Sequence, residues 1–243
     1  MAGHSKWANI KHRKGAQDVK RGKIFTKIIK EVTVSSRIGG GDIESNPRLR
    51  KAVENAKANN MPADNIERAI KKGAGTLKGV KYEEVTYEGY GPSGVAILLE
   101  VVTDNKNRSV SEIRHAFTKF GGNLAENGSV SWLFEKKGVI HLELLNINED
   151  ELYELALNFG TDEIDNKGGI YEVKTEPDIM LNLCKLLRRK GYNIISSNIE
   201  MLPKNYHYPK KEDTQQISLL LELLENNDDV NNVYSNIISD FKH

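Results

Sequence analysis

The chain has 243 residues, more than one domain of ordinary size, and its 38% apolar and 28% charged residues are typical of a water-soluble globular protein. Its longest wholly apolar run, Val95–Leu99, is far shorter than the roughly 20 residues of a membrane span, and its start lacks the apolar segment of a secretory signal. The single cysteine, Cys184, cannot form a disulfide within the chain and suits a reducing cytosol, so we expect a cytoplasmic location.

The formal net charge of +1 conceals a strong charge separation along the chain. Residues 1–80 contain 18 Lys and Arg against 7 Asp and Glu, a net charge of +11, and the remaining residues have a net charge of −10. This pattern predicts a basic module for a polyanion, carried by an acidic body. The alternative is a solvated basic face without a partner.

The first residues form the most basic stretch of the chain. Residues 1–23 contain seven cations and one acid, Asp18, and few large apolar side chains. Such a segment cannot bury enough surface to offset the entropy of ordering. We therefore expect a flexible basic arm over residues 1–22 that orders on an external polyanion. Its cations would bind phosphates, and Trp7 and His4 would stack on exposed bases.

Residues 23–80 are predicted to form a bundle of three helices. In the first helix Ile24, Phe25, Ile28, Ile29 and Val32 recur at helical spacing, and Gly39 follows its end. The second helix begins at Asn46-Pro47 and the third near Pro62. Lys20, Lys23, Lys27 and Lys30 fall on the side of the first helix opposite its apolar face, and this stripe would add phosphate contacts to those of the arm. The inner positions of the other helices are Leu49, Ala52, Val53, Ala56, Ile66 and Ile70.

From Tyr82 onward the apolar period changes to that of strands. Residues 82–90 and 95–102 predict a hairpin, residues 107–121 a helix with a capping box from Ser109 to Glu112, and residues 129–134 another strand. Residues 138–203 show the order β-α-β-β-α-β of the split βαβ, or ferredoxin-like, arrangement. The final helix and strand, after residue 213, would complete the sheet that residues 81–134 begin.

The predicted fold class is therefore α+β: an N-terminal three-helix bundle and two ferredoxin-like α+β domains, the middle one discontinuous. The expected boundaries are the basic arm at 1–22, the bundle at 23–80, the middle domain at 81–136 together with 204–243, and the inserted domain at 137–203.

The motifs give little support for catalysis. The G-x-G-x-x-G pattern of residues 89–94 is followed by a strand rather than a helix, so it predicts a turn and not a dinucleotide site. Cys184 lies on the inner side of a predicted helix, and the six histidines lack the spacing of metal ligands. We expect no catalytic residue, metal or cofactor. A hydrolase in an acidic interdomain cleft formed by Asp104, Glu112 and Glu126 remains an alternative of another class.

Residues 103–117, "TDNKNRSVSEIRHAF", place four polar side chains between a strand and a helix. They predict a capped turn, or alternatively a contact at a domain junction.

Several stretches together resemble the YebC/PmpR family. They are "MAGHSKWANIKHRKGAQDVKRGKIFTK", "GGGDIESNPRLR", "NMPADNIERAIKKG", "YEGYGPSGVA", "TDNKNRSVSEIRHAF" and "FGGNLAENGSVSWLFEKKG". Ser93 stands where the family usually has glycine. The resemblance implies three domains and a cytoplasmic, non-enzymatic regulator of gene expression. Family members are DNA-binding transcriptional regulators or ribosome-associated translation factors that relieve stalling at proline runs, and mitochondrial relatives activate translation of a cytochrome oxidase subunit.

We therefore expect a nucleic-acid-binding regulator, favoured as a translation factor on ribosomal RNA, with promoter DNA as the alternative target. RNA is favoured because the arm lacks the pattern of a groove-reading helix. The sequence leaves the oligomeric state open and predicts no membrane partner. The candidate nucleic-acid-binding residues are His4, Lys6, Trp7, Lys11, Arg13, Lys14, Lys20, Arg21, Lys23 and Lys27.

Overall fold

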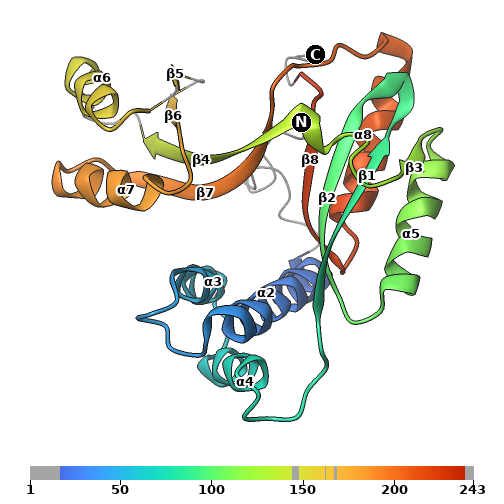
Figure 1. Ribbon diagram of the computed structural model, residues 1–243, viewed down its shortest axis with the longest axis horizontal. Coiled ribbons are helices and arrows are strands. Elements are labelled where there is room, and N and C mark those ends of the chain that lie inside the picture. The colour runs from blue at the N-terminus through green and yellow to red at the C-terminus, as the bar shows by residue number, and fades with distance from the viewer. Residues whose placement is uncertain (1–16, 144–147, 162, 167–168, 239–243) are drawn as a thin grey trace. The chain divides into compact units, whose positions relative to one another are not determined.

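The computed structural model describes the chain except residues 1–16, 144–147, 162, 167–168 and 239–243 (Figure 1). The chain divides into two compact units: unit 1 comprises Met1–Trp132 and Asn205–His243, and unit 2 comprises Leu133–Lys204. The described residues form seven α-helices and two four-stranded antiparallel sheets, which confirms the predicted α+β class with a helical N-terminal part. Within these residues no helix is both long and apolar enough to cross a membrane.

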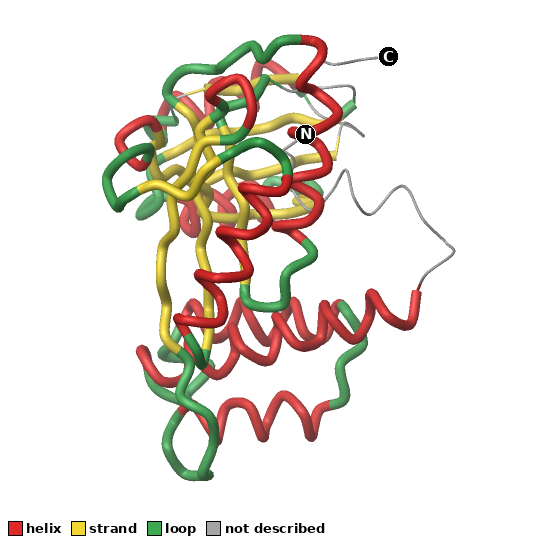
Figure 2. The backbone as a smooth tube through the Cα atoms, turned by 90° about the vertical axis from the view of Figure 1, so that its right-hand side faces the viewer, coloured by secondary structure: helices red, strands yellow, loops and turns green. Residues whose placement is uncertain are grey.

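Three helices form the N-terminal bundle of unit 1: α2 (Gln17–Gly39), α3 (Pro47–Ala58) and α4 (Ala63–Gly73), in the lower part of Figure 2. Helix α3 begins where the sequence predicts, because the Asn46 side chain accepts a hydrogen bond from the Leu49 backbone N–H at 3.0 Å. The buried residues of α3 are the four predicted ones, Leu49, Ala52, Val53 and Ala56, and they pack against Ile28, Val32 and Ile66.

The predicted inner face of α2 is wrong at one end. Ile28 and Val32 are buried and Phe25 and Ile29 pack at the edge of the core, but Ile24 is 44% exposed. The apolar stripe of α2 drifts around the helix because 3.6 residues per turn do not match the spacing of its isoleucines.

The middle sheet of unit 1 has the strand order β3-β1-β2-β8. It consists of β1 (Glu83–Tyr90), β2 (Ala96–Thr103), β3 (Asn123–Ala125) and β8 (Val230–Ser235). Helices α5 (Lys106–Lys119) and α8 (Thr214–Glu225) pack on it and bury the core that contains Ile97, Leu99, Phe117 and Leu220. The strand from the far end of the chain, β8, pairs with β2 from Ile97–Ser235 to Val101–Val230. The last helix and strand therefore complete this sheet, as predicted.

Residues 129–133 are not a strand, contrary to the sequence prediction. The buried carboxylate of Glu88 accepts hydrogen bonds from the backbone N–H groups of Gly128, Val130 and Ser131 at 2.8, 2.6 and 2.9 Å. Burial alone raises the pKa of Glu88, but these three hydrogen bonds outweigh it and lower the pKa. The N–H groups that a ladder would need are thus bound to one side chain, and the edge strand is the short β3.

Unit 2 has the predicted order of elements. They are β4 (Phe134–Glu143), α6 (Glu149–Asn158), β5 (Glu163–Asn166), β6 (Ile170–Thr175), α7 (Met180–Arg189) and β7 (Ile194–Pro203), with the strand order β5-β6-β4-β7. Its core contains Ile140, Leu142, Tyr171 and Leu187, and Cys184 is buried among them. Cys184 is therefore a core side chain, as predicted.

The G-x-G-x-x-G stretch forms the predicted turn between β1 and β2, with a single 3-10 turn at Pro92–Gly94. Ser93 has φ +57°, a left-handed conformation that costs a non-glycine residue roughly 1–2 kcal/mol. Its side chain partly offsets this cost: the Ser93 hydroxyl donates to the Asp213 carboxylate and accepts from the Lys210 N–H at 3.2 Å.

Candidate nucleic-acid interface

Most of the predicted phosphate-binding residues precede the part of the chain that the structure describes. His4, Lys6, Trp7, Lys11, Arg13 and Lys14 lie outside the described residues. The predicted extent of the flexible arm, residues 1–22, is wrong at its end, because helix α2 already begins at Gln17. Lys20 and Arg21 are therefore helical, and the structure describes only their backbone. The described side chains of the predicted site are those of Lys23 and Lys27.

Three lysines of α2 bind the end of helix α8 and the turn that follows it. The amino group of Lys23 donates to the backbone carbonyl of Asn226 at 3.0 Å, and that of Lys27 donates to the carbonyl of Glu225 at 2.6 Å. The amino group of Lys30 donates to the Asp228 carbonyl at 2.9 Å. The sequence places these lysines on one side of α2, and the structure confirms that they act as a row, which we call the α2 lysine row.

The end of α8 provides a natural acceptor for this row. The last carbonyls of a helix have no partner within the helix, and the helix dipole gives its C-terminus a partial negative charge. Helix α8 has no basic residue in its last turn, so the cations come from a helix some 200 positions earlier in the chain. The α2 lysine row therefore joins the bundle to the middle sheet within unit 1.

Lys30 is only 5% exposed, so the prediction that it contributes to a phosphate-binding stripe is wrong. Its amino group forms an ion pair with the carboxylate of Asp229, which is also buried. A buried cation with a carboxylate partner is not available to an external anion, since separating the two would leave both charges desolvated.

Asp229 is the centre of a buried polar cluster. Besides Lys30, its carboxylate accepts hydrogen bonds from Arg108 at 2.8 Å, Ser109 at 2.6 Å and Thr103 at 3.1 Å. Burial alone raises the pKa of Asp229, but the hydrogen bonds from Lys30, Ser109 and Arg108 outweigh it and lower the pKa to about 2. No sequence pattern pointed to this role, because Asp229 lies in a short acidic turn about 120 residues from Arg108.

The "TDNKNRS" stretch is both a capped turn and a junction contact. The Asn105 side chain caps α5 by accepting from the Arg108 N–H at 3.1 Å, and Arg108 itself binds Asp104 and Asp229. The predicted capping box from Ser109 to Glu112 is wrong, because α5 begins one turn earlier and the Ser109 hydroxyl lies inside the helix against Asp229.

A cavity of about 630 Å³ lies at this junction of bundle and middle sheet. Asp104 and Glu112 line it, but Glu126, the third member of the hydrolase alternative, does not. Asp104 is paired with Arg108, and Glu112 accepts from the Asn227 side chain at 2.8 Å. Over the described ranges no group of three His, Cys, Asp or Glu side chains is arranged to hold a metal ion. The three carboxylates therefore do not converge on one site.

Two family models together match most of the chain. The N-terminal domain of the TACO1/YebC proteins matches residues 5–76, and the second and third domains of the same proteins match residues 82–237. The bundle and both sheets thus correspond to the domains of one protein class, and the chain belongs to the TACO1/YebC family.

Relatives agree over nearly the full length. The chain is 55% identical over 237 residues to a probable transcriptional regulatory protein of Syntrophus aciditrophicus, with 97% of this chain and 95% of that protein covered. It is 51% identical to a probable transcriptional regulatory protein of Geobacter sulfurreducens, with the same two shares covered. The crystal structure of a conserved hypothetical protein, Aq1575, from Aquifex aeolicus is similar with a TM-score of 0.84, 43% identity and coverage of 98% of this chain and 100% of that one. The chain is thus a member of a family of regulatory proteins.

Proposed function

We propose that this protein is a non-enzymatic regulator that binds nucleic acid through its N-terminal arm and acts in the cytoplasm as a ribosome-associated translation factor on ribosomal RNA, where it relieves stalling at proline runs. The observation that carries the proposal is the charge of the arm. The first 22 residues contain one acid, Asp18, and six cations: Lys6, Lys11, Arg13, Lys14, Lys20 and Arg21. Cations at this density can neutralise the phosphates of a nucleic acid and release its bound counterions, which favours binding.

The internal hydrogen bonds of the α2 lysine row support assigning the main phosphate contacts to the arm. Lys23 and Lys27 each donate one N–H to a carbonyl of unit 1, and we assign them a secondary role because an ammonium group has three donors. The net charge of −10 in residues 81–243 would repel bulk nucleic acid. Contact is thereby confined to the basic end of the chain.

The names of the relatives favour a second candidate, a transcriptional regulator on promoter DNA. The six cations of residues 1–22 give binding to either target a salt dependence that can be measured. If each binds one phosphate, affinity falls about 300-fold for a single strand and about 10³-fold for a duplex between 50 and 200 mM salt.

The deciding experiment has two parts. Co-sedimentation with ribosomes is measured at physiological salt for the intact protein and for a variant with Lys6, Lys11, Arg13 and Lys14 changed to Gln, and a promoter duplex is added as competitor. We expect ribosome binding by the intact protein, loss of it in the variant and no displacement by the duplex. Displacement at matched concentrations would instead favour the transcriptional role.

The functional part compares translation of a reporter that carries a proline run with one that carries an alanine run of equal length. We expect the intact protein to raise the yield of the proline reporter alone. An equal effect on both reporters would contradict the stalling role without contradicting RNA binding.

A further inference from the structure

A second basic segment lies at the other end of α2. Residues 68–82 contain five cations, Arg68, Lys71, Lys72, Lys78 and Lys81, and no acid. They form the end of α4 and the loop over residues 74–82 that leads to β1, which we call the 74–82 loop. Figure 2 shows this loop in green between α4 and the first strand.

The 74–82 loop has a defined conformation because both of its ends are fixed to the bundle. At its start, Gly73 lies against α2, where a Cβ atom would be 2.2 Å from the Thr33 carbonyl oxygen. Thr76 and Leu77 donate their backbone N–H groups to the Lys71 carbonyl at 3.0 and 3.2 Å. At its end, Arg37 of α2 donates to the Tyr82 carbonyl.

Between these anchors the loop and α2 enclose a concavity of about 350 Å³. Arg37, Lys72 and Lys81 line it together with Gly75 and Gly79. Gly79 approaches the Lys72 side chain so closely that a Cβ atom there would be 3.1 Å from it. Glycine therefore permits the backbone to lie on the aliphatic part of a lysine, which holds that lysine at the edge of the concavity.

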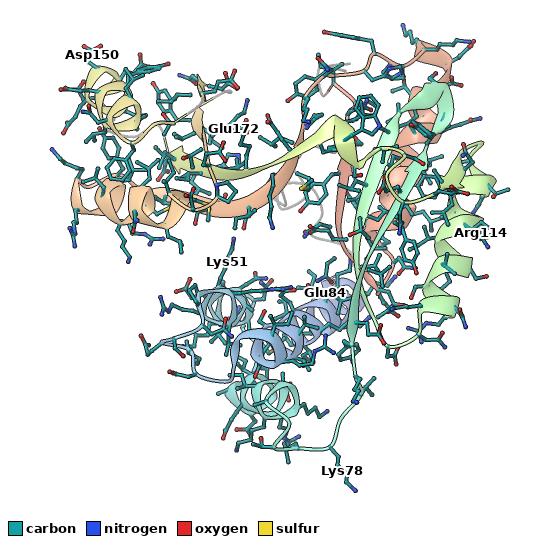
Figure 3. All side chains as sticks on the ribbon, viewed as in Figure 1. Lys51, Lys78, Glu84, Arg114, Asp150 and Glu172 are labelled. Carbon is teal, nitrogen blue, oxygen red and sulfur yellow. The ribbon has the colours of Figure 1, made fainter. Side chains whose placement is uncertain are left out.

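Three cations of this segment lack a carboxylate partner in the described part of the chain. Neighbouring cations are paired: Lys71 with Glu67, Lys106 with Glu83, and Arg48 with Glu31 and Glu84. Lys72, Lys78 and Lys81 are exposed and form no such pair among the described residues. Lys78 extends from the loop away from the helices (Figure 3). Like charges gathered without a counter-charge oppose folding, so their arrangement points to an external anion.

From this geometry we propose that Arg37, Lys72, Lys78 and Lys81 form a second phosphate-binding site for the backbone of the same nucleic acid that the arm binds. The proposal rests on the proposed function. Ammonium and guanidinium groups match a chain of phosphodiesters, and Arg37 keeps N–H donors beyond the one that holds Tyr82.

The length of α2 sets the spacing of the two sites. Arm and loop are joined through the stretch from Gln17 to Arg37, and at 1.5 Å per residue this stretch is about 30 Å long. The same distance spans about nine base pairs of a duplex at 3.4 Å per step. One nucleic acid that reaches both sites gains affinity by multivalency, which neither site provides alone.

The test compares two charge-matched triple variants by fluorescence anisotropy across 50 to 300 mM salt. The loop variant is K72Q/K78Q/K81Q, and the control is K185Q/R188Q/R189Q, which removes three exposed cations from α7 in unit 2. The probes are a mixed-sequence 20-nucleotide RNA and a 20-base-pair DNA duplex. Phosphatidylserine vesicles and inorganic phosphate are tested in separate binding experiments. Urea unfolding of each variant shows that its fold is retained.

We expect the loop variant to lose affinity for nucleic acid by about tenfold or more near 100 mM salt, and the slope of log affinity against log salt to shrink by about two to three. The control variant should keep both values. For the unmodified protein, affinity should rise steeply as the duplex is lengthened past about nine base pairs, and the loop variant should lose this step.

The outcomes separate the two proposals. A steep salt slope in the unmodified protein with no change in the loop variant would overturn the loop site and leave the arm as the binding element. Absence of binding to either nucleic acid would overturn both. A third outcome is that the loop variant loses affinity for vesicles or inorganic phosphate but keeps its affinity for nucleic acid. This result would also overturn the loop site.

Discussion

The bundle has two sets of cations that look alike in the sequence but differ in the structure. The α2 lysine row, Lys23, Lys27 and Lys30, donates to the end of α8 and to Asp229. The second set, Lys72, Lys78 and Lys81 of residues 68–82, forms no ion pair within the described ranges. The difference shows that the lysines of a basic stripe can already be bound to helix termini and carboxylates of their own fold. These internal partners have to be checked before the stripe is interpreted as a phosphate-binding site. The first set should control stability and the second should control binding.

The largest effect is expected from Asp229→Ala. This change leaves the buried ammonium group of Lys30 without its carboxylate, which costs about 3–5 kcal/mol of the free energy of unfolding. Urea unfolding followed by circular dichroism measures the loss. Glu112→Ala is the matched control, since Glu112 is exposed and lines the same cavity. A loss under about 1 kcal/mol in Asp229→Ala would contradict the role of this ion pair.

The next effect is a dependence of stability on acid pH. Because the pKa of Asp229 is lowered to about 2 in the fold, its contribution is complete above the ordinary value of 3.8 and is lost as the pH falls toward 2. The contribution amounts to about 2 kcal/mol. Unfolding measured at pH 5 and pH 2.5 should therefore show a smaller difference for Asp229→Asn than for the unmodified protein. Equal differences would place the acid sensitivity elsewhere.

A smaller effect is expected from the double change K23Q/K27Q. It removes two charge-assisted hydrogen bonds at a partly exposed helix end, so unfolding should become easier by about 1–2 kcal/mol in total. The salt slope of RNA binding should change by less than one. If the salt slope of RNA binding fell by about two while the free energy of unfolding stayed unchanged, Lys23 and Lys27 would be phosphate-binding residues and not stabilising ones.

The smallest effect concerns the stability of the loop variant K72Q/K78Q/K81Q. Its free energy of unfolding should stay within about 0.5 kcal/mol of the unmodified protein, because exposed cations without a partner contribute no favourable contact. The same urea experiment measures it. A loss above 1 kcal/mol would indicate that these lysines have folding partners.

The parts of the fold that depend on local patterns were predictable from the sequence. The four buried positions of α3, the Asn46 cap and the element order of unit 2 follow from apolar spacing and turn residues. The misplaced strand at 129–134 and the misassigned cap at Ser109 share another cause. In both places a buried carboxylate, Glu88 or Asp229, takes up the donors that the local pattern would have used.

The candidate site was predictable only in part. The density of cations in residues 1–23 is visible in the sequence, and so is their one-sided placement along α2. The docking of Lys27 on Glu225 was not predictable, because the two residues are 198 positions apart and the acceptor is a backbone carbonyl, which every residue has. The basic segment at residues 68–82 was overlooked because its cations are spread over the end of α4 and the 74–82 loop and show no period.

The two ends of unit 2 leave and rejoin the chain at neighbouring points. Phe134 is opposite Pro203 in the β4–β7 ladder, and the Lys204 N–H donates to the Leu133 carbonyl at 2.9 Å. Unit 2 is thus an insertion whose first and last residues are neighbours. If unit 2 were removed, a short turn joining Trp132 to Asn205 would close the chain of unit 1. Both products of that excision would keep their own hydrophobic interior, which makes this junction a natural place for exchanging modules between related chains.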